Sequence, residues 1–123
     1  MSTNLLRIYA LAVCFVSVIV FSVSTGIGLY DVVQINLPET TLIGWQYERY
    51  QSNDNFTRDW PRERAMPDDD ALTRLRQDSY RIAIAGEARD AKQSLIQQAI
   101  IMLIMVALFF IHWKLSGKTR EAG

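Results

Sequence analysis

Three kinds of side chain in this sequence could bind a metal or act in catalysis. They are a run of three aspartates (Asp68, Asp69 and Asp70), one histidine (His112) and one cysteine (Cys14). Carboxylates are ligands for Ca²⁺, histidine and cysteine bind transition metals, and a cysteine beside a histidine can become a nucleophile. Each possibility depends on the residues nearby.

The aspartate run lacks the features of a calcium loop. Such a loop alternates oxygen ligands along the chain and turns at a glycine, and neither feature surrounds Asp68–Asp70. The three acids come directly before a stretch that reads as a helix, where carboxylates cap free N–H groups and oppose the helix dipole. We therefore predict that the run starts a helix and binds no metal.

His112 and Cys14 also lack the partners that catalysis needs. Each lies in or at the edge of an apolar run, and neither run contains an acid. A nucleophile requires an adjacent base that a third group orients, and no such set can be assembled here. His112 precedes Trp113 and Lys114, a pattern typical of an anchor at a membrane surface. We expect a protein that is not an enzyme, with no catalytic, metal-binding or cofactor-binding residues and no cofactor.

The two apolar runs, residues 8–30 and 95–113, dominate the chain. Both are free of formal charge and long enough to cross the ~30 Å hydrocarbon core of a bilayer. The first could instead be a cleaved signal peptide, but the apolar part of such a peptide is usually about 7–15 residues long. We favour two transmembrane helices, the first acting as a retained signal anchor.

Residues 69–94 read as a polar helix that continues into the second span. No proline follows Pro67 to interrupt it, and weak apolar periodicity runs along one side. We expect this side to face a partner, although a glycine within it leaves a kink open as an alternative. The residues on the side are Leu72, Leu75, Ile82 and Gly86.

The segment between the two helical parts, residues 31–68, is less clearly patterned. Leu42–Asn55 fits either a strand or a short amphipathic helix, and we favour the helix because Ile43, Tyr47 and Tyr50 recur at helical spacing. Its aromatic side chains suit contact with lipid headgroups or a local cluster against the polar helix, and both readings stay open. Thr57–Pro67 has two prolines and no period, which is typical of a linker.

The distribution of Lys and Arg predicts the orientation. The lead before the first span (residues 1–7) carries Arg7, the tail after the second (residues 114–123) carries three cations, and residues 31–46 carry none. Cytoplasmic flanks are the ones enriched in Lys and Arg. We therefore expect both termini in the cytoplasm and the middle segment outside, in a membrane that we take to be a bacterial inner membrane.

Both spans carry candidate packing residues at alternating spacings of three and four. Small side chains allow helices in lipid to approach closely, and amides can bond between helices or simply reach toward the membrane surface. The set in the first span, called the packing seam below, is Ala10, Cys14, Ser17, Ser24 and Gly28. The set in the second span is Gln98, Met102 and Met105.

Together these patterns predict an all-α membrane protein. It would be a two-span antiparallel transmembrane hairpin in which a long helix extends out of the membrane from the second span. With 13 basic and 13 acidic residues, its composition offers no attraction to nucleic acid, and no motif points to a small-molecule substrate. We expect a structural or accessory subunit that contacts the lipid bilayer and oligomerises or binds a membrane partner. The alternative is a small channel or transporter component, which a buried acid or a polar stripe through a span would favour, and neither apolar run shows such a feature.

Overall fold

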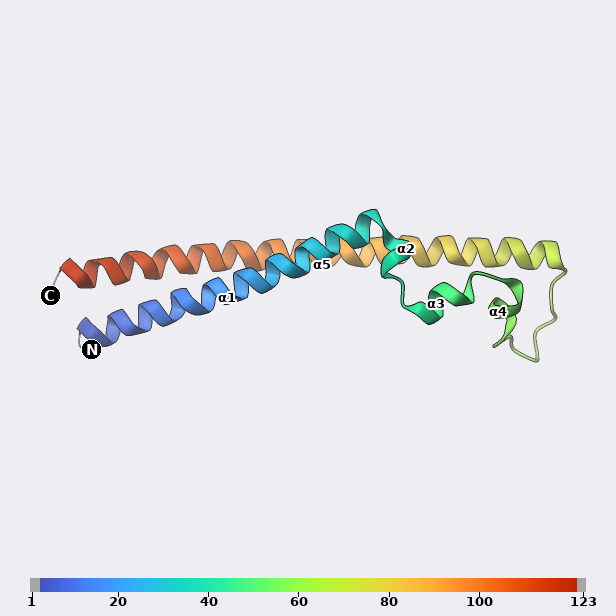
Figure 1. Ribbon diagram of the computed structural model, residues 1–123, viewed down its shortest axis with the longest axis horizontal. Helices are drawn as coiled ribbons and strands as arrows, with labels where there is room; N and C mark the ends of the chain where they lie inside the picture. The colour runs from blue at the N-terminus through green and yellow to red at the C-terminus, as the bar shows by residue number, and fades with distance from the viewer. Residues whose placement is uncertain (1–2, 122–123) are drawn as a thin grey trace. The chain divides into compact units, whose positions relative to one another are not determined.

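The computed structural model describes residues 3–121, and this part of the chain contains helices and no strand. The helices are α1 (Thr3–Asn36), α2 (Pro38–Thr41), α3 (Gly44–Arg49), α4 (Asn53–Thr57) and α5 (Asp69–Glu121) (Figure 1). The predicted all-helical class is confirmed. α1 and α5 are both long and apolar enough to cross a membrane.

The chain forms two compact units. The first contains Met1–Asp31 and Gln93–Gly123, and the second contains Val32–Lys92. The long helices α1 and α5 each contribute residues to both units. Both predicted membrane spans, residues 8–30 and 95–113, fall entirely in the first unit, and the polar segments fall mainly in the second.

In the first unit, α1 and α5 lie side by side and run in opposite directions (Figure 1). The ring of Tyr9 packs edge-on against His112, with 5.7 Å between the ring centroids. Nearer the other end of the unit, a Cβ at Gly28 would lie 3.5 Å from Cδ1 of Leu95. Rising numbers in α1 therefore pair with falling numbers in α5, as an antiparallel arrangement requires.

α1 extends past the predicted end of the first apolar run at Tyr30 and stops at Asn36. No proline interrupts it before Pro38, whose ring disfavours helical geometry at the preceding residue. Leu37 accordingly leaves the helix, with φ −132° and ψ 57°, and Pro38 occupies the first turn of α2. Asp31, which the sequence analysis placed beyond the span, is therefore a residue of the same helix.

The single helix that we expected over Leu42–Asn55 is instead two short helices, α3 and α4. Ile43 is extended, with ψ 135°, so α3 begins only at Gly44. Ser52 is also extended, and its hydroxyl caps α4 by accepting a hydrogen bond from the N–H of Asn55 at 3.1 Å. This local side-chain cap breaks the helix in two, which the apolar periodicity did not reveal.

α5 begins where the aspartate run predicts a helix start. Oδ1 of Asp68 accepts a hydrogen bond from the backbone N–H of Ala71 at 2.7 Å, so the predicted capping role of the run is confirmed for this residue. The helix then continues without interruption through Gly86 to Glu121. The polar helix and the second apolar run are thus one element.

Candidate functional site

The five residues of the packing seam lie on one side of α1 and are all buried within the structure. Their alternating spacing of three and four keeps the side chains on one side of the helix, as in a left-handed helix pair. Small side chains there let the facing helix approach closely.

Contacts within the first unit show what the seam faces. The thiol of Cys14 lies 3.6 Å from the carbonyl oxygen of Phe109, and Oγ1 of Thr25 lies 3.4 Å from Sδ of Met102. A Cβ at Gly28 would lie 3.9 Å from Cβ of Gln98. The structure therefore brings the seam against α5 of the same chain, and Met102 and Gln98 of the second predicted set lie along it.

Asp31 continues the seam and is the residue that the sequence analysis missed. It follows Gly28 by three residues and Ser24 by seven, so it extends the same spacing. Its side chain is 3% exposed, and its Oδ2 has no hydrogen-bond partner. A buried carboxylate oxygen without a partner costs free energy, so its presence requires a specific explanation. Extending the seam by one step would have found this residue.

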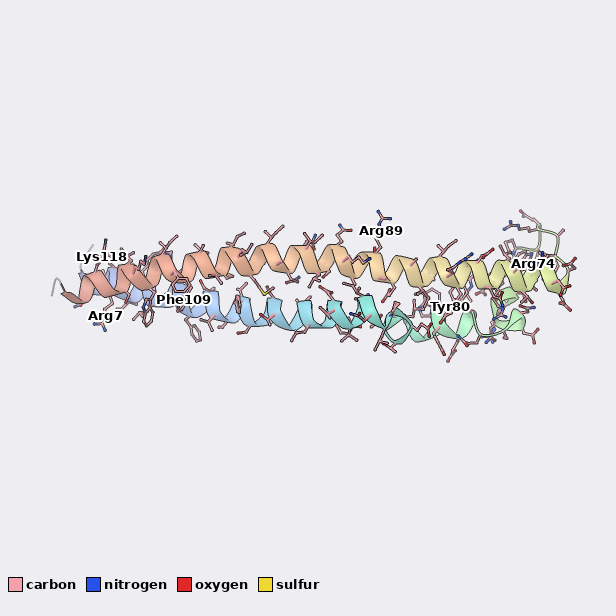
Figure 2. All side chains as sticks on the ribbon, turned by 90° about the horizontal axis from the view of Figure 1, so that it is seen from above. Arg7, Arg74, Tyr80, Arg89, Phe109 and Lys118 are labelled. Carbon is pink, nitrogen blue, oxygen red and sulfur yellow. The ribbon has the colours of Figure 1, made fainter. Side chains whose placement is uncertain are left out.

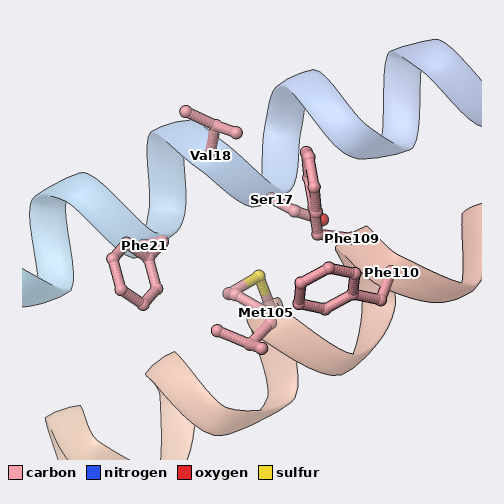
Figure 3. Close-up of a pocket in the computed structure, with 7 residues that line it drawn as sticks. Ser17, Val18, Phe21, Met105, Phe109 and Phe110 are labelled. Atoms are coloured by element: carbon pink, nitrogen blue, oxygen red, sulfur yellow. The ribbon is translucent and has the colours of Figure 1, made fainter. Parts of the chain in front are cut away.

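Met105, the third residue of the second predicted set, lines an apolar groove between the two helices (Figure 3). The groove has a volume of about 190 Å³. Apart from Ser17, the side chains that line the groove are apolar, and most of them are large. The lining residues are Ser17, Val18, Phe21, Met105, Val106, Phe109 and Phe110.

In the second unit, polar bonds attach the segment between α3 and α4 to α5. Arg76 donates from Nε to Oδ1 of Asn53 at 2.9 Å and from Nη1 to the carbonyl oxygen of Tyr50. Asn53 in turn donates to Oγ1 of Thr73 at 3.0 Å. At the end of α1, Gln34 donates to Oε1 of Glu87 at 2.7 Å. No spacing rule in the sequence indicates these pairs.

The apolar side predicted for the polar helix is only partly covered. Leu72 is buried within the chain and Gly86 is half-buried. Leu75 lies at the border of exposure, whereas Ile82 is 72% exposed. Whether a partner covers the exposed residues stays a prediction, but Leu72 no longer needs one.

The aromatic residues of the middle segment form a local cluster with α5. The ring of Tyr50 lies 5.6 Å from that of Tyr80 and 6.1 Å from that of Phe56, measured between centroids. Burial raises the pKa of Tyr80, and the negative charge of Glu39 and then the neighbouring Tyr47 raise it further. Of the two readings of these aromatics, the structure places Tyr50 and Phe56 in the local cluster.

The other chemically capable residues make structural contacts. Nδ1 of His112 lies 2.8 Å from the carbonyl oxygen of Leu108, one helical turn back. Among residues 3–121, no three His, Cys, Asp or Glu side chains gather where they could hold a metal ion. What the arrangement offers is surface for helix packing and for binding, with one buried carboxylate at the end of the seam.

Comparison with known proteins adds no relative. No family model, curated protein or solved structure matches this chain.

Proposed function

We propose that this chain is a non-enzymatic integral membrane protein, a structural or accessory subunit that oligomerises or binds a larger membrane complex. In this proposal α1 and α5 cross the membrane as an antiparallel hairpin. Support comes from large apolar side chains of both helices that are exposed, such as Phe15 and Leu103. Exposing apolar surface of this kind to water costs free energy, whereas contact with lipid chains removes that cost.

The proposed orientation places both termini in the cytoplasm, in a bacterial inner membrane. Arg7 and Lys118 lie toward the same end of the hairpin, near its two termini (Figure 2). Lys114 adds a third cation in the same region of the sequence. Cations collect on the cytoplasmic side of membrane proteins. Reporter fusions after Gly123 and within residues 57–67 should report opposite sides, and a C-terminal fusion active only outside would exclude this orientation.

The observation that carries the subunit proposal is the exposure of Ile82. Leu72 on the same helix is covered by the chain itself, whereas Ile82 is 72% exposed. Burying such a side chain stabilises a protein by about 1.5–3 kcal/mol. A second copy or a partner subunit that packs on this part of α5 would supply that burial.

Cysteine crosslinking in native membranes tests the proposal. In a Cys14→Ser background, Ile82→Cys should crosslink to a neighbouring chain. Arg74→Cys, on the same helix at an exposed charged position (Figure 2), is the matched control and should stay free. Equal crosslinking at both positions, or none at either, would remove the main support for a partner on α5.

A second candidate function is a small channel or transporter component, and Asp31 favours it. Ionisable residues buried between membrane helices commonly mark ion or proton pathways. If the chain conducts, ion flux into liposomes that contain the purified protein should fall on Asp31→Asn and persist on Asp90→Asn, which changes an exposed acid of α5. Absence of flux from the wild-type protein would dismiss this candidate.

A further inference from the structure

A small hollow between α3 and α4 in the second unit carries charges of both signs. It has a volume of about 160 Å³ and is open to solvent. One water molecule occupies about 30 Å³ in the liquid, so a fragment of several heavy atoms would fit. Its lining residues are Trp45, Glu48, Arg49, Asn55, Arg58 and Asp59.

Two arginines of the hollow are held in place by uncharged groups. Nη2 of Arg58 donates to Oδ1 of Asn55 at 3.0 Å, and Nδ2 of Asn55 donates to the carbonyl oxygen of Glu48 at 3.0 Å. The guanidinium carbon of Arg49 lies 5.8 Å from the centre of the Phe56 ring. Because the holding groups carry no charge, both guanidiniums keep their full positive charge toward a ligand.

The two acids of the hollow do not neutralise these arginines. Among residues 3–121, one ion pair has its nitrogen and oxygen atoms within 4.0 Å of each other. It joins Arg81 to Asp78, and neither residue lines the hollow. Glu48 and Asp59 line the same space as Arg49 and Arg58 and form no such pair with them. The hollow therefore presents separate positive and negative groups, which complement a ligand that has both charges.

We propose that this hollow, which is open to solvent, binds a soluble zwitterionic phosphate ester of the phosphoethanolamine type, which carries a phosphate and an ammonium group. Guanidinium groups match phosphate oxygens in geometry and charge, and the acids would receive the ammonium. A carboxylate would be satisfied by one guanidinium fork, so the presence of two favours phosphate.

The first test uses the full-length protein in an uncharged detergent. Glycerophosphoethanolamine is titrated in while nuclear magnetic resonance follows the Nε–H signals of Arg49 and Arg58. Both signals should shift saturably, and Arg58→Gln should weaken binding by about tenfold or more. Arg89→Gln, which removes an outward-pointing cation of α5 (Figure 2), should leave binding unchanged. No saturable shift at either arginine would overturn the proposal.

The second test asks whether the site recognises both the phosphate and the ammonium group of the ligand. Glu48→Gln should weaken binding of glycerophosphoethanolamine, and it should preserve or strengthen binding of glycerophosphoglycerol, which lacks the ammonium. A wild-type protein that binds both compounds equally, together with a Glu48→Gln variant that changes neither, would overturn recognition of a zwitterion.

The third test asks whether a lipid can supply the same group. In nanodiscs of phosphatidylethanolamine, the signals of Arg49 and Arg58 should stay at their free positions and should still shift when the soluble ester is added. Signals that already show the bound shift in these nanodiscs would overturn the assignment to a soluble ester. Stable incorporation of the protein into nanodiscs is measured separately by co-elution, so a failure of the membrane proposal is distinguished from a failure of this site.

Discussion

Nε of Arg76 donates a hydrogen bond to Oδ1 of Asn53 at 2.9 Å, and this bond links α5 directly to the first residue of α4. The same guanidinium donates to the carbonyl oxygen of Tyr50, at the end of α3. One side chain of α5 therefore holds both short helices through the residues between them. Helices of this length are unstable alone, so their order depends on such contacts.

Arg76→Lys should loosen the segment that contains α3 and α4. Lysine keeps the charge but cannot present the planar fork that reaches two acceptors at once, so we expect a local loss of about 1–3 kcal/mol. Hydrogen exchange of residues 44–57 should speed up accordingly. Arg74→Lys, two residues away and exposed, is the control. Unchanged exchange in the Arg76 variant would show that other contacts hold the segment.

Gly28 and Gly26 form a matched pair on α1. A Cβ at Gly28 would lie 3.5 Å from Cδ1 of Leu95, whereas a Cβ at Gly26 would face open space, with no atom of another described segment within 4 Å. Gly28→Leu should therefore overpack the helix interface and destabilise the protein by about 1–3 kcal/mol, while Gly26→Leu should not. Thermal unfolding in detergent measures the difference. Equal transition temperatures for the two variants would contradict close packing at Gly28.

Asp31→Asn should stabilise the isolated protein. The substitution keeps the shape of the side chain and removes a buried charge whose Oδ2 has no partner. We expect the free energy of unfolding in detergent to rise by about 1–3 kcal/mol. Asp90→Asn on the exposed surface of α5 should change it little. A loss of stability in the Asp31 variant would instead reveal a favourable interaction of the carboxylate.

Tyr80 should make the second unit sensitive to alkaline pH. Burial, with Glu39 and Tyr47 nearby, raises its pKa above the ordinary value of 10.0, so folding favours the neutral phenol. This contribution to stability is present below the ordinary pKa and is lost as the pH rises through the raised pKa. Titration of tyrosinate absorbance should show one late-titrating group that disappears in Tyr80→Phe. A wild-type titration without that group would refute the assignment.

The helical class and the two long apolar helices could be predicted from the sequence, which also marked the residues of the packing seam. Each of these depends on local information: uncharged runs, the absence of proline and a repeat of three and four residues. The helix start at Asp68 is local in the same sense, because the carboxylate caps an N–H only three residues away. Such features are encoded within a few helical turns, so they can be read without the rest of the fold.

Which residues are buried, and what they contact, could be learned only from the tertiary structure. The periodicity marked Leu72 and Ile82 alike, yet only Leu72 is covered by the chain. Asp31 became a buried carboxylate because α1 continues past the apolar run along the side that carries the seam. The bond between Arg76 and Asn53 joins residues 23 positions apart, and no local pattern encodes that pairing. Burial and long-range hydrogen bonds depend on which segments contact each other in the folded chain. Those contacts are determined by the free energy of the whole chain and not by any local stretch of sequence.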